Sequence, residues 1–193
     1  MAEIFGDFFE IGECLEFLVI SFSSSSIPIQ ERWRNNSLSA DFLADYWGTF
    51  FPVHNKSFHE RSEVQDTVNY IANELLENAV KFNWEKSKHP IKIALFLTED
   101  VLRFYVTNGV NPESVGQFQK FIQEILTEDT DELYIRQLES NAGEEEGSES
   151  YLGFLTMIND YNARMAWKFE TLEKPEGIAV TTMVELAVVR TQE

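Results

Sequence analysis

The sequence predicts one α/β (α+β) domain, a two-layer sandwich with a mixed, mostly antiparallel sheet and helices on one face. Short apolar runs alternate with stretches of helical periodicity, and turn residues separate them. Two pairs of apolar runs also follow each other closely enough to form hairpins. The 193 residues, 44% of them hydrophobic, are enough to bury the core of a single domain over residues 1–193.

The N-terminal part is expected to contribute a strand and a helix. Residues 15–22 are rich in β-branched and aromatic side chains and run into four serines, which predicts a strand followed by a loop. Residues 41–51 carry one broad apolar stripe at helical spacing, formed by Phe42, Leu43, Tyr46, Trp47, Phe50 and Phe51. We expect Ser37 or Ser39 to cap this helix and Pro52 to end it.

A longer helix and a hairpin follow. Residues 61–82 repeat apolar side chains every three or four positions, at Val64, Val68, Ile71, Leu75, Ala79 and Phe82, which predicts a helix that packs on the sheet. Residues 91–97 and 101–106 are two apolar runs around a three-residue turn, which predicts a hairpin. The triplet Thr107-Asn108-Gly109 is expected to end its second strand.

The C-terminal half alternates the two patterns again. Helical spacing returns over 112–126, weakly over 131–138, and over 151–161, while 165–169 and 178–189 are predicted strands joined by a turn at 175–177. Within this half, residues 128–149 hold nine acidic residues against the single base Arg136. That composition favours a mobile segment.

The charge balance narrows the range of partners. The chain has 15 Lys and Arg against 33 Asp and Glu, a net charge of −18. Proteins bind nucleic acid and anionic membrane surfaces through basic patches, which this acidic chain cannot easily supply. We therefore expect neither as a partner. No apolar run reaches the length of a bilayer span. Cys14 is the one cysteine, which leaves no intrachain disulfide or multi-cysteine zinc site and favours a cytoplasmic protein.

Three polar residues share one edge of the helix predicted over 61–82. At about 100° per residue, Glu74, Asn78 and Lys81 fall in one narrow strip beside the apolar stripe. An amide oxygen ligates a hard cation, an ammonium group meets phosphate and a carboxylate polarises a hydroxyl, so the set suits a magnesium–nucleotide site. From the spacing alone, the solvated edge of an ordinary helix is the favoured interpretation.

Residues 74–82 read Glu-Leu-Leu-Glu-Asn-Ala-Val-Lys-Phe. This string looks like the N box of the GHKL ATPases, which include histidine-kinase catalytic domains, gyrase, Hsp90-type chaperones and MutL, and the order of the later motifs resembles that superfamily too. Residues 106–110 stand where the family has its Asp-x-Gly adenine box, and 151–155 where it has its second glycine box. The resemblance covers roughly residues 61–190, the nucleotide-binding core of a Bergerat (GHKL) fold, and makes 111–150 the expected ATP lid and 1–60 an extension.

The resemblance implies a role for each matching residue. Glu74 would be the general base, Asn78 the Mg²⁺ ligand, and Lys81 would lie near the phosphates of ATP. At the second glycine box, Leu152, Gly153 and Phe154 would bind nucleotide, with backbone N–H groups approaching phosphate at the start of a helix. A glycine needed for close helix–sheet packing is an equally good interpretation of Gly153.

The adenine box departs from the family pattern. Thr107 occupies the position of the family's aspartate, two residues before Gly109. The Thr107 hydroxyl or the Asn108 carbonyl can still accept a hydrogen bond from adenine, although either is weaker than a carboxylate. Which of the two faces the nucleotide depends on the register of the strand by one residue.

The N-terminal part points to a narrower group. Residues 26–46 look like the small stand-alone GHKL proteins of cyanobacteria, and so do residues 158–161 and 167–170. These are similar to anti-sigma-factor serine/threonine kinases, which implies phosphorylation of a small, anti-sigma-antagonist-like partner in a partner-switching pathway. In that family a helix ahead of the N box can serve in dimer formation, so the resemblance also allows a homodimer, although the aromatic stripe of residues 41–51 is more often core than interface.

A binding module is the alternative function. Thr107 and the acidic lid favour a degenerate GHKL-fold protein that sequesters a regulator without ATP turnover, whereas Glu74 and Asn78 favour the kinase.

Overall fold

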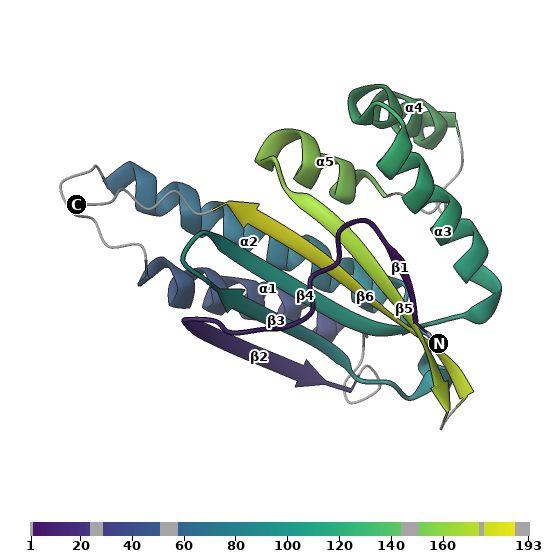
Figure 1. Cartoon of the computed structure of the whole chain (residues 1–193), viewed down its shortest axis with the longest axis horizontal. Helices are drawn as coiled ribbons and strands as arrows, with labels where there is room; N and C mark the ends of the chain where they lie inside the picture. Colours follow the sequence, from purple (N-terminus) through teal and green to yellow (C-terminus); the bar gives the residue numbers. More distant parts are fainter. Residues whose placement is uncertain (1, 24–28, 51–57, 144–150, 174–175, 188–193) are drawn as a thin grey trace.

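A six-stranded antiparallel sheet organises the chain (Figure 1). The computed structural model describes residues 2–23, 29–50, 58–143, 151–173 and 176–187. The strands are β1 (Ala2–Phe5), β2 (Glu16–Phe22), β3 (Ile91–Leu97), β4 (Val101–Val110), β5 (Arg164–Glu173) and β6 (Glu176–Ala187), and they lie in the order β1-β5-β6-β4-β3-β2. Both predicted hairpins are confirmed, as β3–β4 and β5–β6. Every strand pairing in the described residues is antiparallel, so the α+β sandwich is confirmed and the sheet is not mixed.

Helices cover one face of this sheet. They are α1 (Ile29–Gly48), α2 (Phe58–Lys81), α3 (Pro112–Thr127), α4 (Thr130–Gly143) and α5 (Leu152–Tyr161), with a 3₁₀ turn, η1, at Glu85–Ser87. Side chains from α1, α2, α3 and α5 join the inward residues of the strands in one hydrophobic core. Its largest fully buried members include Trp47, Trp167 and Phe104. The apolar stripe predicted along α2 is therefore confirmed, with Val68, Ile71 and Leu75 almost fully buried.

The opposite face of the sheet carries a smaller apolar cluster. Ala94, Tyr105, Ala166 and Met183 form it, and Phe8 packs against it. The segment between β1 and β2 crosses this face (Figure 1), where the Tyr105 hydroxyl donates to the carbonyl of Phe9 over 2.8 Å. The N-terminal segment thus covers part of the face that lacks helices.

Several predicted boundaries were wrong. The first helix begins at Ile29, so Ser37 and Ser39 lie inside it instead of capping it. The Ser39 hydroxyl donates to the carbonyl of Asn35 over 2.8 Å, an internal contact of the helix. Pro52 lies outside the described residues.

The triplet Thr107-Asn108-Gly109 does not end its strand, because β4 continues to Val110 and pairs with β6 along its whole length. The pairing with β6 supplies the hydrogen bonds that override the local turn signal. Likewise β6 already begins at Glu176, inside the turn predicted at 175–177.

The expected lid contains two helices. Within 111–150, α3 buries Val115, Phe121, Ile122 and Ile125 in the core. Asn111 caps this helix, with its side-chain oxygen accepting from the Glu113 N–H over 3.2 Å. The predicted helix at 112–126 is confirmed, and α3 is a packed element of the domain.

Candidate functional site

The strip predicted on α2 faces the start of α5. Glu74, Asn78 and Lys81 line a groove of about 300 Å³ together with Leu152 and Gly153 from α5. Tyr70, Glu77 and Thr156 complete its walls. Five of the residues predicted for the nucleotide site therefore meet in one groove, although α2 and α5 are about seventy residues apart in the sequence.

Gly153 makes room for the Glu74 carboxylate. A Cβ at position 153 would collide with Oε2 of Glu74 and stand 3.1 Å from its Cδ. The glycine thus leaves room for the Glu74 carboxylate in its present orientation against α5, and a larger residue at 153 would displace the end of that side chain.

The environment of Glu74 favours its protonated form. Burial raises the pKa of the Glu74 carboxyl above its ordinary value of 4.5, and the neighbouring Glu77 carboxylate raises it further. Glu77 is itself held by Asn73, whose side-chain N–H donates to Oε1 of Glu77 over 2.8 Å. Glu74 therefore takes up a proton more readily than a glutamate exposed to water.

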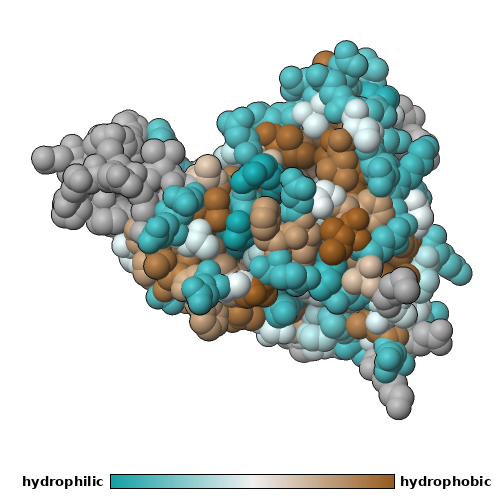
Figure 2. Space-filling model, in the orientation of Figure 1, coloured by the Kyte–Doolittle hydropathy of each residue, from teal (hydrophilic) through white to brown (hydrophobic). Residues whose placement is uncertain are grey.

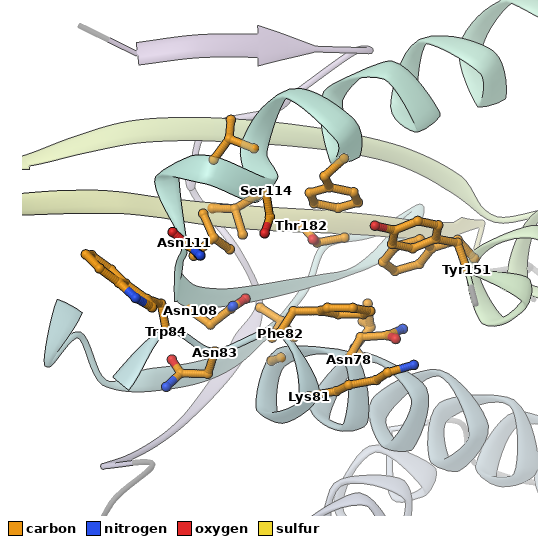
Figure 3. Close-up of a pocket in the computed structure, with 18 residues that line it drawn as sticks. Asn78, Lys81, Phe82, Asn83, Trp84, Asn108, Asn111, Ser114, Tyr151 and Thr182 are labelled. Carbon is orange, nitrogen blue, oxygen red and sulfur yellow. The ribbon is translucent and has the colours of Figure 1, made fainter. Parts of the chain in front are cut away.

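A deeper apolar cavity opens beside the groove (Figure 3). Its volume is about 240 Å³, and α2, α3, the start of α5 and strands β4 and β6 enclose it. Asn78 and Lys81 line both hollows, so the cavity and the groove adjoin along the last turns of α2. Lys81 is exposed at this junction, with Nζ 5.1 Å from the centre of the Phe82 ring.

Stacked aromatic rings form one wall of the cavity. Tyr151 stacks on Phe121 at 4.3 Å between ring centres, on Phe118 at 5.6 Å and on Phe82 at 5.7 Å. Phe154 is buried against the same group. A cavity bounded by flat rings is suited to a planar, apolar ring system.

A few polar groups reach this apolar cavity. Asn108 is 5% exposed and lines it, and its side-chain N–H donates to the carbonyl of Gly109 over 3.2 Å. The side-chain oxygen of Asn108 can therefore accept a hydrogen bond from a ligand (Figure 3). Thr182 lines the cavity from β6, and Asn111 and Ser114 line it from the start of α3.

Thr107 lies on the other face of the sheet. Its hydroxyl is 2.9 Å from that of Thr181 on β6, and side chains along a strand alternate between the two faces. The register therefore points Asn108 into the cavity and Thr107 away from it. Thr107, predicted as a nucleotide contact, is not among the residues that line either hollow.

Gly109 supports the cavity wall from behind. A Cβ at position 109 would collide with Oγ of Ser87 and lie 2.7 Å from its Cβ. The carbonyl of Gly109 accepts from the N–H of Trp84 over 2.8 Å, which ties η1 to β4. Gly109 thus fixes the position of Trp84, a cavity residue, and does not itself line the cavity.

Sequence reasoning missed most of the aromatic wall. Phe82 and Trp84 follow α2, Phe118 lies in α3 and Tyr151 precedes α5, so only the fold brings these three segments together. Phe82 was predicted as part of the apolar stripe of its helix and as the last residue of the N-box string, and no role in the site was assigned to it. The position of Tyr151, as the first residue of the glycine box expected at 151–155, was the one local signal that could have identified it.

No protein-family model matches this chain, and a search of curated proteins found no match either. The described helices include none with the length and apolar character needed to cross a bilayer. In the same part of the chain, histidine, cysteine and carboxylate side chains do not gather in threes as metal ligands would. The site therefore has to be interpreted from its own chemistry.

Proposed function

We propose that this protein binds ATP with Mg²⁺ and acts as a regulatory serine/threonine kinase of the anti-sigma-factor type, with a small protein as its phosphate acceptor. The observation that carries the proposal is the junction of an apolar, ring-walled cavity with a polar groove at Asn78 and Lys81. The adenine base of ATP would fit the apolar cavity, and the phosphates would fit the polar groove.

The polar residues have distinct tasks under this proposal. The Asn78 amide oxygen would hold Mg²⁺, a hard cation that prefers oxygen ligands and retains water ligands. Lys81 is exposed at the mouth and would meet phosphate as a point charge. Its charge and that of the metal would offset the repulsion between phosphates and the two glutamates of the groove. ATP, when bound, supplies the phosphoryl group.

Glu74 would act on the acceptor. Its carboxylate lies in the groove beside Asn78 and Lys81, where an incoming serine or threonine hydroxyl would donate its proton to it. The raised pKa of Glu74 makes it a stronger base than an exposed carboxylate. The hydroxyl oxygen would form the new bond to phosphorus while the bond between the terminal phosphorus and the bridging oxygen of ATP breaks, leaving ADP.

A binding module without turnover is the second candidate. It is favoured by the absence of a carboxylate among the described residues that line the ring-walled cavity, where Asn108 is the polar group on β4. Such a protein would use the same fold to hold a regulator, and its affinity for the regulator would not depend on Glu74.

Replacing Asn78 by alanine is expected to weaken Mg²⁺-dependent ATP binding at least tenfold, because it removes the proposed oxygen ligand of the metal. Calorimetric titration of the folded variant with Mg²⁺–ATP measures the loss. Asn69→Ala is the matched control, since Asn69 lies on the same helix but donates to Asp41 over 2.6 Å on the side of α1. Equal affinities for the two variants would contradict the assignment of Asn78.

A further inference from the structure

The groove between α2 and α5 continues beyond Glu74, on the side away from the ring-walled cavity. Tyr70 lies one helical turn before Glu74 on α2 and lines this part of the groove. Thr156 lies about one turn after Gly153 on α5 and lines it from the other side. When phosphates occupy the end at Lys81, as proposed above, the end at Tyr70 is the part left for the acceptor. We call it the far end of the groove.

Two stacked tyrosine rings stand at the far end. Tyr70 stacks on Tyr161, the last residue of α5, with 5.0 Å between the ring centres and 19° between the ring planes. Both residues are half-buried, so part of the pair is open to solvent. Tyrosine rings attract cations to their faces, and the planar guanidinium of arginine stacks on them better than the ammonium of lysine. The pair is therefore suited to a flat cation.

Carboxylates lie beside this pair. Asp160 precedes Tyr161 on α5, Asp66 lies one turn before Tyr70 on α2, and both aspartates are exposed. Burial raises the pKa of the Tyr161 hydroxyl, and the charges of Asp160 and Asp66 raise it further, so both carboxylates are near that ring. Among the described residues that line the groove, the one base is Lys81, at the opposite end. The far end is thus an acidic and aromatic surface.

We propose that the far end of the groove binds an arginine of the acceptor protein, two to four residues away from the serine or threonine that is phosphorylated. The guanidinium rests on the Tyr70–Tyr161 pair, where Asp66 and Asp160 offset its charge. This inference rests on the proposed function and names its substrate class, a hydroxyl residue within a basic segment.

Helix geometry sets the spacing between the two residues of the acceptor. Tyr70 is four residues and Asp66 eight residues before Glu74, which corresponds to about 6 and 12 Å along the axis of α2. An extended chain advances about 3.3 Å per residue. A hydroxyl held at Glu74 therefore places a side chain two to four residues away beside Tyr70 and Asp66, in either chain direction.

The net charge of the protein does not by itself define such a site. A charge of −18 attracts any basic segment at long range. What distinguishes the far end is an open aromatic pair with two carboxylates, one to three turns from the proposed general base Glu74. An arginine bound there lies at a fixed distance from Glu74, whereas a general attraction fixes no distance.

Short synthetic peptides test the proposal on the wild-type chain. Each dye-labelled peptide has one serine in a glycine and alanine background, and a single arginine whose position varies on either side of the serine. Fluorescence anisotropy in Mg²⁺–ADP measures binding without transfer of phosphate. An arginine two to four residues from the serine is expected to strengthen binding about tenfold over alanine at the same position. Lysine should give a smaller gain, and glutamate should weaken binding.

Asp160→Lys reverses the charge at the far end. Position 160 is in the last turn of α5, where the helix dipole favours a cation, so the variant is expected to fold. It should lose the preference for arginine and bind the glutamate peptide more tightly than the wild type does. The comparison of peptides on the wild type needs no variant, so the proposal stays testable in any case.

Glu13→Lys is the matched control, because it makes the same change in net charge elsewhere. Glu13 is exposed on the segment between β1 and β2, which crosses the helix-free face of the sheet. That face is turned to the viewer in Figure 2, where brown apolar patches lie among hydrophilic side chains, whereas α2 and α5 cover the other face. This variant should keep the arginine preference of the wild type.

Two results would overturn the proposal. One is equal affinity for the arginine and alanine peptides at every position, and the other is an arginine preference that Asp160→Lys leaves unchanged. Repeating the comparison with ATP labelled at the terminal phosphate separates this inference from the proposed function. Arginine peptides that bind through Asp160 but are never labelled would support the arginine site and count against the kinase.

Discussion

Glu74→Gln is expected to slow phosphoryl transfer from ATP to the acceptor hydroxyl by roughly 10²- to 10⁴-fold. The amide has nearly the shape of the carboxylate but cannot take the proton from the hydroxyl. Because Glu74 lines the groove between α2 and α5, a near-isosteric change is the one that alters its chemistry with the least change in packing. ATP binding should change little, since Asn78 and Lys81 are left in place.

The folded Glu74→Gln chain can also serve to find the acceptor. A small protein that copurifies with the variant would be incubated with the wild type and with the variant, each with ATP labelled at the terminal phosphate. Labelling of a serine or threonine by the wild type alone would support the kinase. A bound protein that neither form labels would favour the binding module instead.

The pH dependence of stability separates loss of chemistry from loss of structure. The folded chain raises the pKa of Glu74 above the 4.5 of the unfolded chain, so the folded state binds the proton more tightly. Ionisation of Glu74 therefore lowers stability as pH rises from about 4.5 through the folded pKa. Glutamine has no such titration, so the variant should melt at or above the wild-type temperature at pH 7, with the difference vanishing near pH 4.

Gly109→Ala is expected to lower the free energy of unfolding by roughly 1–3 kcal/mol. The new methyl group would lie 2.7 Å from Cβ of Ser87, which is fully buried and cannot move aside. The Ser87 hydroxyl donates to the carbonyl of Trp84 over 2.7 Å, so a shift of Ser87 would disturb the turn that holds the cavity wall. Calorimetry should show a melting temperature lower by roughly 2–10 °C for a chain of this length.

Gly116→Ala provides the comparison for that effect. A Cβ at position 116 meets no atom within 4 Å, and the residue lies in α3. Alanine there is expected to leave stability unchanged or raise it by about 0.5–1 kcal/mol, because glycine is the poorer helix former. A Gly109→Ala chain as stable as the wild type would refute the packing role of this glycine.

Local sequence patterns predicted the helices and strands that have a regular spacing of apolar residues. The stripe on α2 and the β3–β4 hairpin were visible because one face of each is buried throughout. β1 was missed because its four residues show no pattern of their own, and only pairing with β5 makes them a strand. The start of α1 was missed because residues before Asp41 carry few apolar side chains.

The residues of the candidate site also fall into those that the sequence could predict and those that depend on the fold. Glu74, Asn78 and Lys81 could be grouped from the sequence because helical geometry alone places them on one strip. The choice between Thr107 and Asn108 could not be made, since it depends on the register of β4 against β6. The aromatic wall depends on contacts between distant segments, which no local pattern contains.

The central claim is that the cavity and the groove together form one nucleotide site. The most direct test is to follow the NMR chemical shifts of the protein while it is titrated with Mg²⁺–ATP. The account predicts saturable shifts, dependent on Mg²⁺, in the side-chain amides of Asn78 and Asn108 and the backbone of Gly153, while Asn69 stays unchanged. Shifts confined to other surfaces, or none at millimolar ATP, would contradict it.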